Sequence, residues 1–436
     1  MDHTGLLERA LKIRRPLFMI RSFSCTNFRN VNVSDLNFSR INILIGPNNS
    51  GKTNFIKALS FCADMMNCSG SLIGDSAFQT MISKRGMGDI FNKYSKDSPK
   101  SIHMKWNIDL AGAKKVSYML QFHTGNEMKD FFILKEKLDD CCESGNETIP
   151  FNYFTCHEKQ GQGYISQTIN PGEADKRISF DIPRNDTVLR QFDRIRLENK
   201  EIYEASGRQV GLIQKLKEYF GKYYFYSSSQ FDLVKIREPQ GIQMDGKILA
   251  KDGSNFVNVV NYYKNQDISH IYTYLEKLKE LMPSLELADV MAEFNKLVFK
   301  IRYDGQQFSL EDLSDGTVKA FLLTMLIQIP VNDGLAMLAI DEPEMNIHPA
   351  WQQIIGRWIQ KSDHFKQCFI STHSPDFLDT FTEGFKRGEV SVFVFDPREE
   401  VIVKKLNYSQ MAEELEDWEL GDLYRVNDPS IGGWPW

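Results

Sequence analysis

The segment Gly46–Thr53, with the sequence GPNNSGKT, constrains the fold of this chain more than any other feature. It matches the pattern G-x-x-x-x-G-K-[ST]. The apolar run Ile41–Ile45 precedes it and predicts a buried parallel strand, and the segment Asn54–Cys62 follows it with helical spacing. A glycine-rich turn between a buried strand and a helix can bind phosphate, because its backbone N–H groups and the helix dipole face an anion. The sequence therefore predicts an α/β nucleotide-binding domain.

The residue types in this loop have distinct roles toward a nucleotide. We expect Lys52 to reach the β- and γ-phosphates and Thr53 to supply a ligand to Mg²⁺. The predicted cofactors are therefore ATP and Mg²⁺. The predicted nucleotide-binding residues of the loop are Gly46, Asn48, Asn49, Ser50, Gly51, Lys52 and Thr53.

A second apolar run, Leu335–Ile340, ends in two adjacent carboxylates, Asp341 and Glu342. Ligands of α/β sheets bind at the carboxyl ends of the strands. We expect Asp341 to hold Mg²⁺ directly or through water, and Glu342 to polarise the attacking water as a general base. Adjacent acids after a strand are often only a solvated strand end. The phosphate-binding loop in the same chain favours the functional interpretation.

Two further segments accompany these motifs. LSDGT (313–317) precedes a long apolar stretch with helical character, and STHS (371–374) ends another predicted strand. The serine and glycine of the first segment, at a helix start, form a second anion cradle that can bind the γ-phosphate of a nucleotide held by another subunit. In isolation, a helix cap and a loop histidine are the simpler interpretations, but the order of the motifs favours function. The predicted second-site residues are Ser314, Asp315 and Gly316, and the predicted catalytic residues are Lys52, Glu342 and His373.

Composition excludes several classes of protein. The 436 residues are 42% hydrophobic and 25% charged, which is typical of a folded globular chain. The net charge of −6 argues against a protein that coats nucleic acid through bulk charge, although a local basic surface stays open. The longest apolar stretch, Phe321–Val331, is interrupted and too short to span a membrane. The N-terminus lacks the pattern of a signal peptide, so we expect a cytoplasmic protein. The seven cysteines are scattered and lack the spacing of a zinc site, so we expect reduced thiols.

The order of patterns predicts an α/β fold with a mainly parallel sheet, flanking helices and an antiparallel β lobe. Short strand-like runs between residues 102 and 236, interrupted by a helix at 209–220, indicate an inserted β-rich and helical region. The predicted divisions are 1–17 (N-terminal helix), 18–122 (first part of the nucleotide-binding domain), 123–300 (inserted β-rich lobe and short helical arm) and 301–436 (second part of that domain).

Some smaller elements are also predicted. Asp304–Gly305 indicates a hairpin turn, and the stretch 267–282 an amphipathic helix. The acidic run between Glu413 and Asp422 predicts a solvated helix face with Trp418 and Leu420 packed inward. For the two terminal tryptophans, packing onto the domain and docking of a partner are both open. The residues expected to face inward on the amphipathic helix are Ile268, Ile271, Leu275, Leu278 and Met282, and the terminal tryptophans are Trp434 and Trp436.

Taken together, the motifs resemble a known family. The set is NFRN (27–30), GPNNSGKTN (46–54), LSDGT (313–317), IDEPEMNIHP (340–349) and STHSPDFL (371–378). It resembles the ABC-type P-loop ATPase heads of the RecF, SMC and OLD group, and more closely the stand-alone AAA-family ATPases of prokaryotic defence and toxin-antitoxin loci. Weaker landmarks of that family lie at 237–239, 252–255, 420–424 and 432–433.

The resemblance implies a head that forms a homodimer, with two ATP molecules sandwiched between one subunit's phosphate loop and the other's signature segment. Ser314 and Gly316 match that signature, His373 matches the switch histidine, and the stretch 346–348 matches the segment that crosses the dimer interface. For the glutamine of the Q-loop and for a basic switch residue, no pattern secures the candidates Gln79 and Arg85.

The signature departs from the LSGGQ that is usual in ABC transporters. Asp315 brings an acid close to a triphosphate, so we expect hydrolysis to be slow or to depend on a partner. With no membrane segment in the sequence, a transporter is excluded and no membrane partner is expected.

The function that the resemblance implies is a sensor or scaffold that controls a separately encoded toxic effector, such as a nuclease, in antiphage defence. PARIS-like and Septu-like systems are of this two-gene kind. The implied partners are a second copy of the chain or a higher homo-oligomer, the effector and a phage protein as trigger, with nucleic acid left open. One alternative is a RecF-like DNA-repair ATPase that loads partners onto DNA. The other is an OLD-type nuclease, which the lack of a D-x-D pair after Glu342 disfavours.

Overall fold

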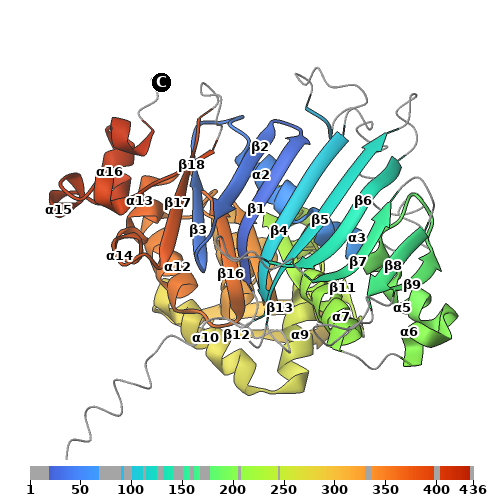
Figure 1. Cartoon of the computed structure of the whole chain (residues 1–436). Helices are drawn as coiled ribbons and strands as arrows, with labels where there is room; N and C mark the ends of the chain where they lie inside the picture. The colour runs from blue at the N-terminus through green and yellow to red at the C-terminus, as the bar shows by residue number, and fades with distance from the viewer. Residues whose placement is uncertain are drawn as a thin grey trace, which may run out of the picture.

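The structure is a computed structural model, and its elements form three sheets with helices packed between and around them (Figure 1). It describes residues 19–67, 90–92, 101–110, 114–124, 131–141, 151–157, 162–166, 177–204, 208–243, 246–328, 335–396 and 403–432. The predicted N-terminal helix, Gln79, Arg85, Trp434 and Trp436 lie outside these residues. Among the residues described, no helix is both long and apolar enough to cross a lipid bilayer.

The central sheet has six strands and is parallel except for its last strand. Its order is β10 (Tyr223–Ser227), β15 (Leu335–Asp341), β16 (Phe365–Ser371), β3 (Ile41–Ile45), β17 (Val390–Phe395) and β18 (Val403–Lys405). Every residue of β3, β15 and β17 is buried, as expected of parallel strands covered on both faces. Leu44 belongs to the core on one face and Ile43 to the core on the other. The predicted fold class is confirmed.

An antiparallel sheet of eight strands forms the lobe at the centre and right of Figure 1. Its order is β2 (Val31–Asn37), β1 (Met19–Phe28), β4 (Ser101–Leu110), β5 (Lys114–Thr124), β6 (Phe131–Asp140), β7 (Asn152–His157), β8 (Gln162–Ser166) and β9 (Arg177–Asp181). Alternate residues of β4 are buried, because one face of the sheet packs on helices. Those helices are α2 (Lys52–Leu59), α3 (Phe61–Met66), α5 (Val188–Glu198), α6 (Lys200–Glu204) and α7 (Arg208–Gly221).

The sheets cross the expected boundary between the first two large divisions. The expected boundary between residues 122 and 123 falls within β5, which pairs with β4 on one side and β6 on the other. Residues 223–227, which the expected divisions place in the inserted region, form β10 and pair with β15 in the central sheet. The expected helix at 209–220 is present as α7.

A third, smaller sheet lies with helices at the bottom of Figure 1. Its strands are β11 (Gln240–Gly241), β12 (Leu285–Glu293), β13 (Lys296–Tyr303) and β14 (Gln306–Ser309), and the helices are α8 (Leu233–Arg237), α9 (Phe256–Gln266) and α10 (Ser269–Leu281). The expected hairpin is confirmed, with positive φ at Asp304 and Gly305. Helix α10 is also confirmed, but Ile268 is 52% exposed because it precedes the first helical turn, and Tyr274 is buried instead.

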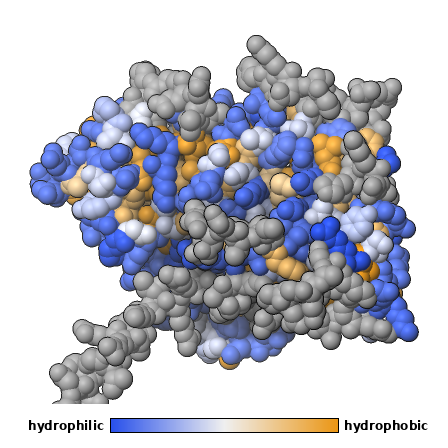
Figure 2. All heavy atoms as spheres, viewed as in Figure 1, coloured by the Kyte–Doolittle hydropathy of each residue, from blue (hydrophilic) through white to orange (hydrophobic). Residues whose placement is uncertain are grey.

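The C-terminal part completes the central sheet with helices. They are η4 (Leu310–Asp312), α11 (Asp315–Gln328), α12 (Pro349–Lys361), α13 (Pro375–Asp379), α14 (Thr382–Lys386), η5 (Tyr408–Gln410), α15 (Glu414–Asp417), α16 (Leu420–Arg425) and η6 (Pro429–Ile431). Figure 2 shows hydrophilic residues over most of this end of the molecule, at the left, as expected of a solvated acidic face. Leu420 is buried as expected, but the prediction that Trp418 packs inward is wrong. Trp418 is 43% exposed, because the backbone becomes extended there after α15.

Candidate nucleotide-phosphate site

The loop between β3 and α2 has a backbone path that only glycine allows at two positions. Gly46 has φ 145° and Gly51 has φ 105°. A Cβ atom at Gly46 would lie 2.5 Å from the carbonyl oxygen of Phe395, and one at Gly51 would lie 2.7 Å from Nδ2 of Asn30. The glycines therefore let the loop pass close to its neighbours and open its interior to a ligand.

Two polar side chains point into this loop. Lys52 is 5% exposed, and its Nζ donates hydrogen bonds to the carbonyl oxygens of Gly46 at 2.8 Å and Pro47 at 3.0 Å. Burial lowers the pKa of Lys52 to about 8, against the opposing effect of nearby carboxylates. The hydroxyl of Ser50 is buried and has no hydrogen-bond partner among the described residues. An ammonium group and an unpaired buried hydroxyl in one cradle fit a phosphate ligand.

Hard oxygen ligands meet beside the loop. The Thr53 hydroxyl lies 3.0 Å from both carboxylate oxygens of Asp341, and the hydroxyls of Ser371 and Ser227 also bond to Asp341. Parallel pairing of β10, β15, β16 and β3 brings the ends of these strands to one edge. Thr53 and Asp341 fit Mg²⁺, which would neutralise charge on the β- and γ-phosphates when bound.

Glu342 and His373 follow the ends of neighbouring strands. The backbone N–H of Glu342, a residue with φ 52°, bonds to the carbonyl oxygen of Ser371 at 3.1 Å. Nε2 of His373 lies 3.6 Å from Oε1 of Glu342 and forms no hydrogen bond within the part of the chain that the structure describes. Burial, followed by the charge of Asp341, raises the pKa of Glu342. Burial, followed by the charge of Lys52, lowers the pKa of His373 to about 4. His373 is therefore neutral at pH 7 and can donate or accept a hydrogen bond.

Sequence reasoning missed Glu344. Its Oε1 accepts a hydrogen bond of 2.7 Å from the backbone N–H of His373, and burial raises its pKa. Glu344 therefore determines where the His373 peptide sits relative to Glu342. The sequence signals only a third acid close after Asp341 and Glu342, because the contact with His373, 29 positions later, depends on the parallel pairing of β15 and β16.

The predicted signature residues do not join the loop within this chain. Ser314 and Asp315 are exposed, and the Ser314 hydroxyl accepts a hydrogen bond from the backbone N–H of Thr317 at 3.2 Å, as a helix cap does. Asp315 pairs with Arg237 at 2.7 Å.

The signature segment packs against the stretch that follows Glu342. A Cβ atom at Gly316 would lie 2.2 Å from the carbonyl oxygen of Asn346, so these two segments form one surface. Asn346 and His348 are exposed on it. Of the remaining predicted residues, Asn48 and Asn49 are exposed on the outside of the phosphate loop. The structure therefore unites the loop, Asp341, Glu342 and His373, and leaves the signature on a separate exposed surface.

A family model matches most of this chain. The family model AAA_15, described as the AAA ATPase domain, matches residues 19–378. Endonuclease GajA of Bacillus cereus (strain VD045) is 25% identical over 375 residues, which are 81% of this chain and 55% of GajA. The OLD nuclease of Thermus scotoductus (strain ATCC 700910 / SA-01) is 23% identical, over 83% of this chain and 60% of that protein.

A retron protein and a solved structure are also similar. The retron Ec83 probable ATPase of Escherichia coli is 24% identical, over 42% of this chain and 39% of that protein. The solved structure of an SMC head bound to the C-winged helix domain of ScpA is 13% identical, with a TM-score of 0.49, and the match covers 90% of this chain and 99% of that one. The chain spans about half the length of the curated relatives GajA and the OLD nuclease.

Proposed function

This chain belongs to the AAA ATPase domain family, and from that premise we propose that it hydrolyses ATP between two copies of itself. The ATP-driven assembly controls a separately encoded toxic effector, a nuclease, in cytoplasmic antiphage defence. The observation that carries the catalytic part is the meeting of Thr53, Asp341 and Glu342 at one edge of the central sheet, with His373 beside them.

The residues at this edge have separate roles in ATP binding and hydrolysis. The loop amides and Lys52 bind the phosphates, and Thr53 with Asp341 holds Mg²⁺. Glu342 orients and deprotonates the attacking water, and its raised pKa brings it closer to the range useful for proton transfer. Neutral His373, 3.6 Å away, keeps Glu342 in place or donates to the γ-phosphate.

The exposed surface of Ser314, Asp315, Asn346 and His348 supports an interface between two copies. A helix start that is unused by its own chain's phosphate loop is available to the nucleotide of a partner. Asp315, the acid that we expected to slow hydrolysis, forms an ion pair with Arg237 at 2.7 Å. Its negative charge is therefore compensated before a triphosphate approaches. We therefore propose that dependence on a partner, more than repulsion by Asp315, limits the rate.

The effector part of the proposal is supported by the relatives' names. Two of them are named as nucleases and one as a probable ATPase of a retron. We propose that the nuclease controlled by this chain is a separately encoded protein, as in the two-gene defence systems that the motifs resemble. A phage protein is the proposed trigger.

The experiment compares the native mass of Glu342→Gln with that of Lys52→Ala, each with and without Mg-ATP. Each variant is co-expressed with its genomic neighbours. Glu342→Gln keeps the phosphate ligands and lacks the base, so we expect an ATP-dependent assembly that contains two copies or more and a stoichiometric second protein. Lys52→Ala, which loses the buried ammonium, is the control and stays smaller under the same conditions.

Other outcomes change the proposal in defined ways. An ATP-dependent dimer without a second protein favours the RecF-like alternative, and DNA binding is then measured. Identical masses for both variants at all ATP concentrations contradict the assigned site.

A further inference from the structure

The C-terminal helix α16 packs directly on the segment that follows His373. Helix α13 begins two residues after His373, and α16 contacts it along its length. The approach is close: a Cβ atom at Gly421 would lie 2.2 Å from both the Pro375 carbonyl oxygen and an Asp379 carboxylate oxygen. The backbone N–H of Gly421 donates to that Asp379 oxygen at 2.6 Å. Only glycine allows this distance between the two helices.

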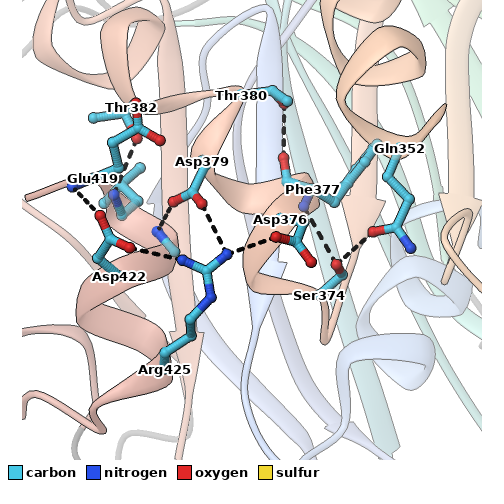
Figure 3. Close-up of polar contacts among 12 residues, drawn as sticks. Gln352, Ser374, Asp376, Phe377, Asp379, Thr380, Thr382, Glu419, Asp422 and Arg425 are labelled. Carbon is cyan, nitrogen blue, oxygen red and sulfur yellow. Dashed lines mark hydrogen bonds and ion pairs between the residues drawn. The ribbon is translucent and has the colours of Figure 1, made fainter. Parts of the chain in front are cut away.

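One arginine connects three carboxylates across this contact (Figure 3). Arg425 bonds to Asp422 in its own helix at 2.7 Å, and to Asp376 at 2.7 Å and Asp379 at 3.1 Å in α13. The Arg425 side chain is 40% exposed, so the ion pairs add little to overall stability. They do hold α13 in one position, because loss of the guanidinium leaves three carboxylates facing one another.

Tyr424, the residue before Arg425, lies on the side of α16 toward the phosphate loop. Tyr424 is 7% exposed, and the backbone N–H of Gly46, the first residue of the phosphate loop, is close enough to its phenol to oppose the effect of burial on the pKa of that group. The carbonyl oxygen of Gly46 accepts the hydrogen bond from Lys52 at 2.8 Å. Burial, followed by the charge of Glu344, raises the pKa of Tyr424 to about 12, so the hydroxyl stays protonated. Two consecutive residues of α16 thus contact the phosphate loop and the segment after His373.

We infer that α16 is a positioning element of the nucleotide site, in which Tyr424 and Arg425 hold Lys52 and His373 in one productive arrangement. Neither residue touches the nucleotide; each acts through the backbone of a segment that does. The inference rests on the proposed ATP hydrolysis, and it assigns a role to the C-terminal motif at 420–424, which the proposed mechanism does not use. An element that reaches both segments at once sets their separation, and small errors in separation lower the rate of a chemical step much more than ligand affinity.

The test uses the full chain with Arg425→Gln and Tyr424→Phe, and Arg387→Gln as the matched control. Arg387 forms an exposed ion pair of 2.9 Å with Glu389 in the same part of the molecule and contacts neither segment. For each variant, titration with a fluorescent ATP analogue counts the intact sites, and kcat is expressed per intact site. We expect kcat to fall about tenfold in Arg425→Gln and about threefold in Tyr424→Phe, with KM changed less than twofold. Arg425→Lys, which keeps the charge, restores part of the loss.

The outcomes separate this inference from the proposed function. A wild-type protein that hydrolyses no ATP, even in a single-turnover assay, overturns both. If the wild type and Arg387→Gln hydrolyse ATP while Arg425→Gln and Tyr424→Phe keep the wild-type kcat per site, only the inference fails. A loss explained entirely by fewer intact sites, or by lower thermal stability without a change in kcat per site, also overturns the inference, because it shows a purely structural role.

Discussion

Nε2 of His373 lies 3.6 Å from Oε1 of Glu342, although 31 positions separate the two residues in the sequence. They follow β16 and β15, which are parallel neighbours with Asp341 paired to Ser371. The contact places a neutral imidazole beside a carboxylate whose pKa is raised. This pair suits a site in which Glu342 accepts a proton while His373 keeps its protonation state.

His373 should therefore not titrate in the pH range where the protein works. With its pKa lowered to about 4, we expect kcat/KM, which reports the free protein, to show no step from His373 between pH 5.5 and 8. His373→Ala should lower kcat roughly tenfold or more at every pH in this range. A step near pH 6.5 in the wild type that His373→Ala removes would contradict the neutral assignment.

Lys52 should make ATP binding depend on pH. Because its pKa is lowered to about 8, the ammonium that attracts phosphate is lost as the pH rises above 8. We expect the dissociation constant for ATP to increase between pH 8 and 9.5 in the wild type and to stay flat in Lys52→Ala, as measured by fluorescence titration. A Lys52→Ala variant with the same pH dependence would assign the effect to another group.

The lowered pKa of Lys52 also predicts that the protein without nucleotide becomes more stable as the pH rises above 8, although its affinity for ATP falls. A lysine with a lowered pKa destabilises the fold below pH 8, and this penalty disappears as the pH rises to the ordinary lysine value of 10.5. The wild type should therefore gain stability relative to Lys52→Met over that range, as denaturant unfolding at several pH values can show. A constant difference between the two proteins would argue against a buried ammonium.

Arg237 should matter for assembly through Asp315, with which it pairs at 2.7 Å. Arg237→Gln leaves the carboxylate uncompensated where a partner's triphosphate is proposed to bind, so ATP-dependent dimerisation should weaken about tenfold, or about 1.4 kcal/mol. Asp315→Asn should change it little. Arg237 also donates to the carbonyl oxygens of Leu310 and Leu313, and the double variant separates the two effects. Recovery in Arg237→Gln/Asp315→Asn supports the electrostatic role, and no recovery assigns the loss to the carbonyl contacts.

Glu136 should make the stability of the β lobe depend on pH. It is fully buried, accepts hydrogen bonds from the Tyr118 hydroxyl and the backbone N–H groups of Val188 and Leu189, and burial raises its pKa to about 7. The folded state therefore binds the proton more tightly than the unfolded state, so stability from this group is full below pH 4.5 and is lost as the pH rises to 7.

The measurement compares the wild type with Glu136→Gln. We expect the wild type to lose up to roughly 3 kcal/mol of unfolding free energy relative to Glu136→Gln between pH 4.5 and 7, at about 1.4 kcal/mol per pKa unit. The exposed variant Glu218→Gln is the control and should follow the wild type. Parallel curves for wild type and Glu136→Gln would show that Glu136 stays ionised in the folded protein.

Features confined to one strand, loop and helix were predictable from sequence. The phosphate loop, β3 and β15 were predicted at their observed positions, because glycine placement and a continuous apolar run are local signals. The hairpin at Asp304–Gly305 is of the same kind, since positive φ at both residues is a property of the turn itself.

Features that depend on distant partners were not predictable in the same way. Asp315 is neutralised by a residue 78 positions earlier, and nothing in either local segment indicates the pairing. Residues 223–227 were placed in the inserted region, because their own pattern does not show that β15 is the neighbour of the strand they form. Trp418 was expected inside, because an apolar residue in an acidic run suggests packing, yet Trp418 is 43% exposed.

The sequence by itself determined the α/β class, the phosphate loop and the two acids at the end of β15, because each depends on residues adjacent in the chain. Only the tertiary structure decided that Glu344 holds the His373 peptide, that Arg237 pairs with Asp315 and that α16 joins Gly46 to α13. The residues in these contacts are at least 29 positions apart in the sequence, and Arg237 and Asp315 are 78 apart. Which segments meet depends on the strand order of the parallel sheet, and no local pattern encodes that order.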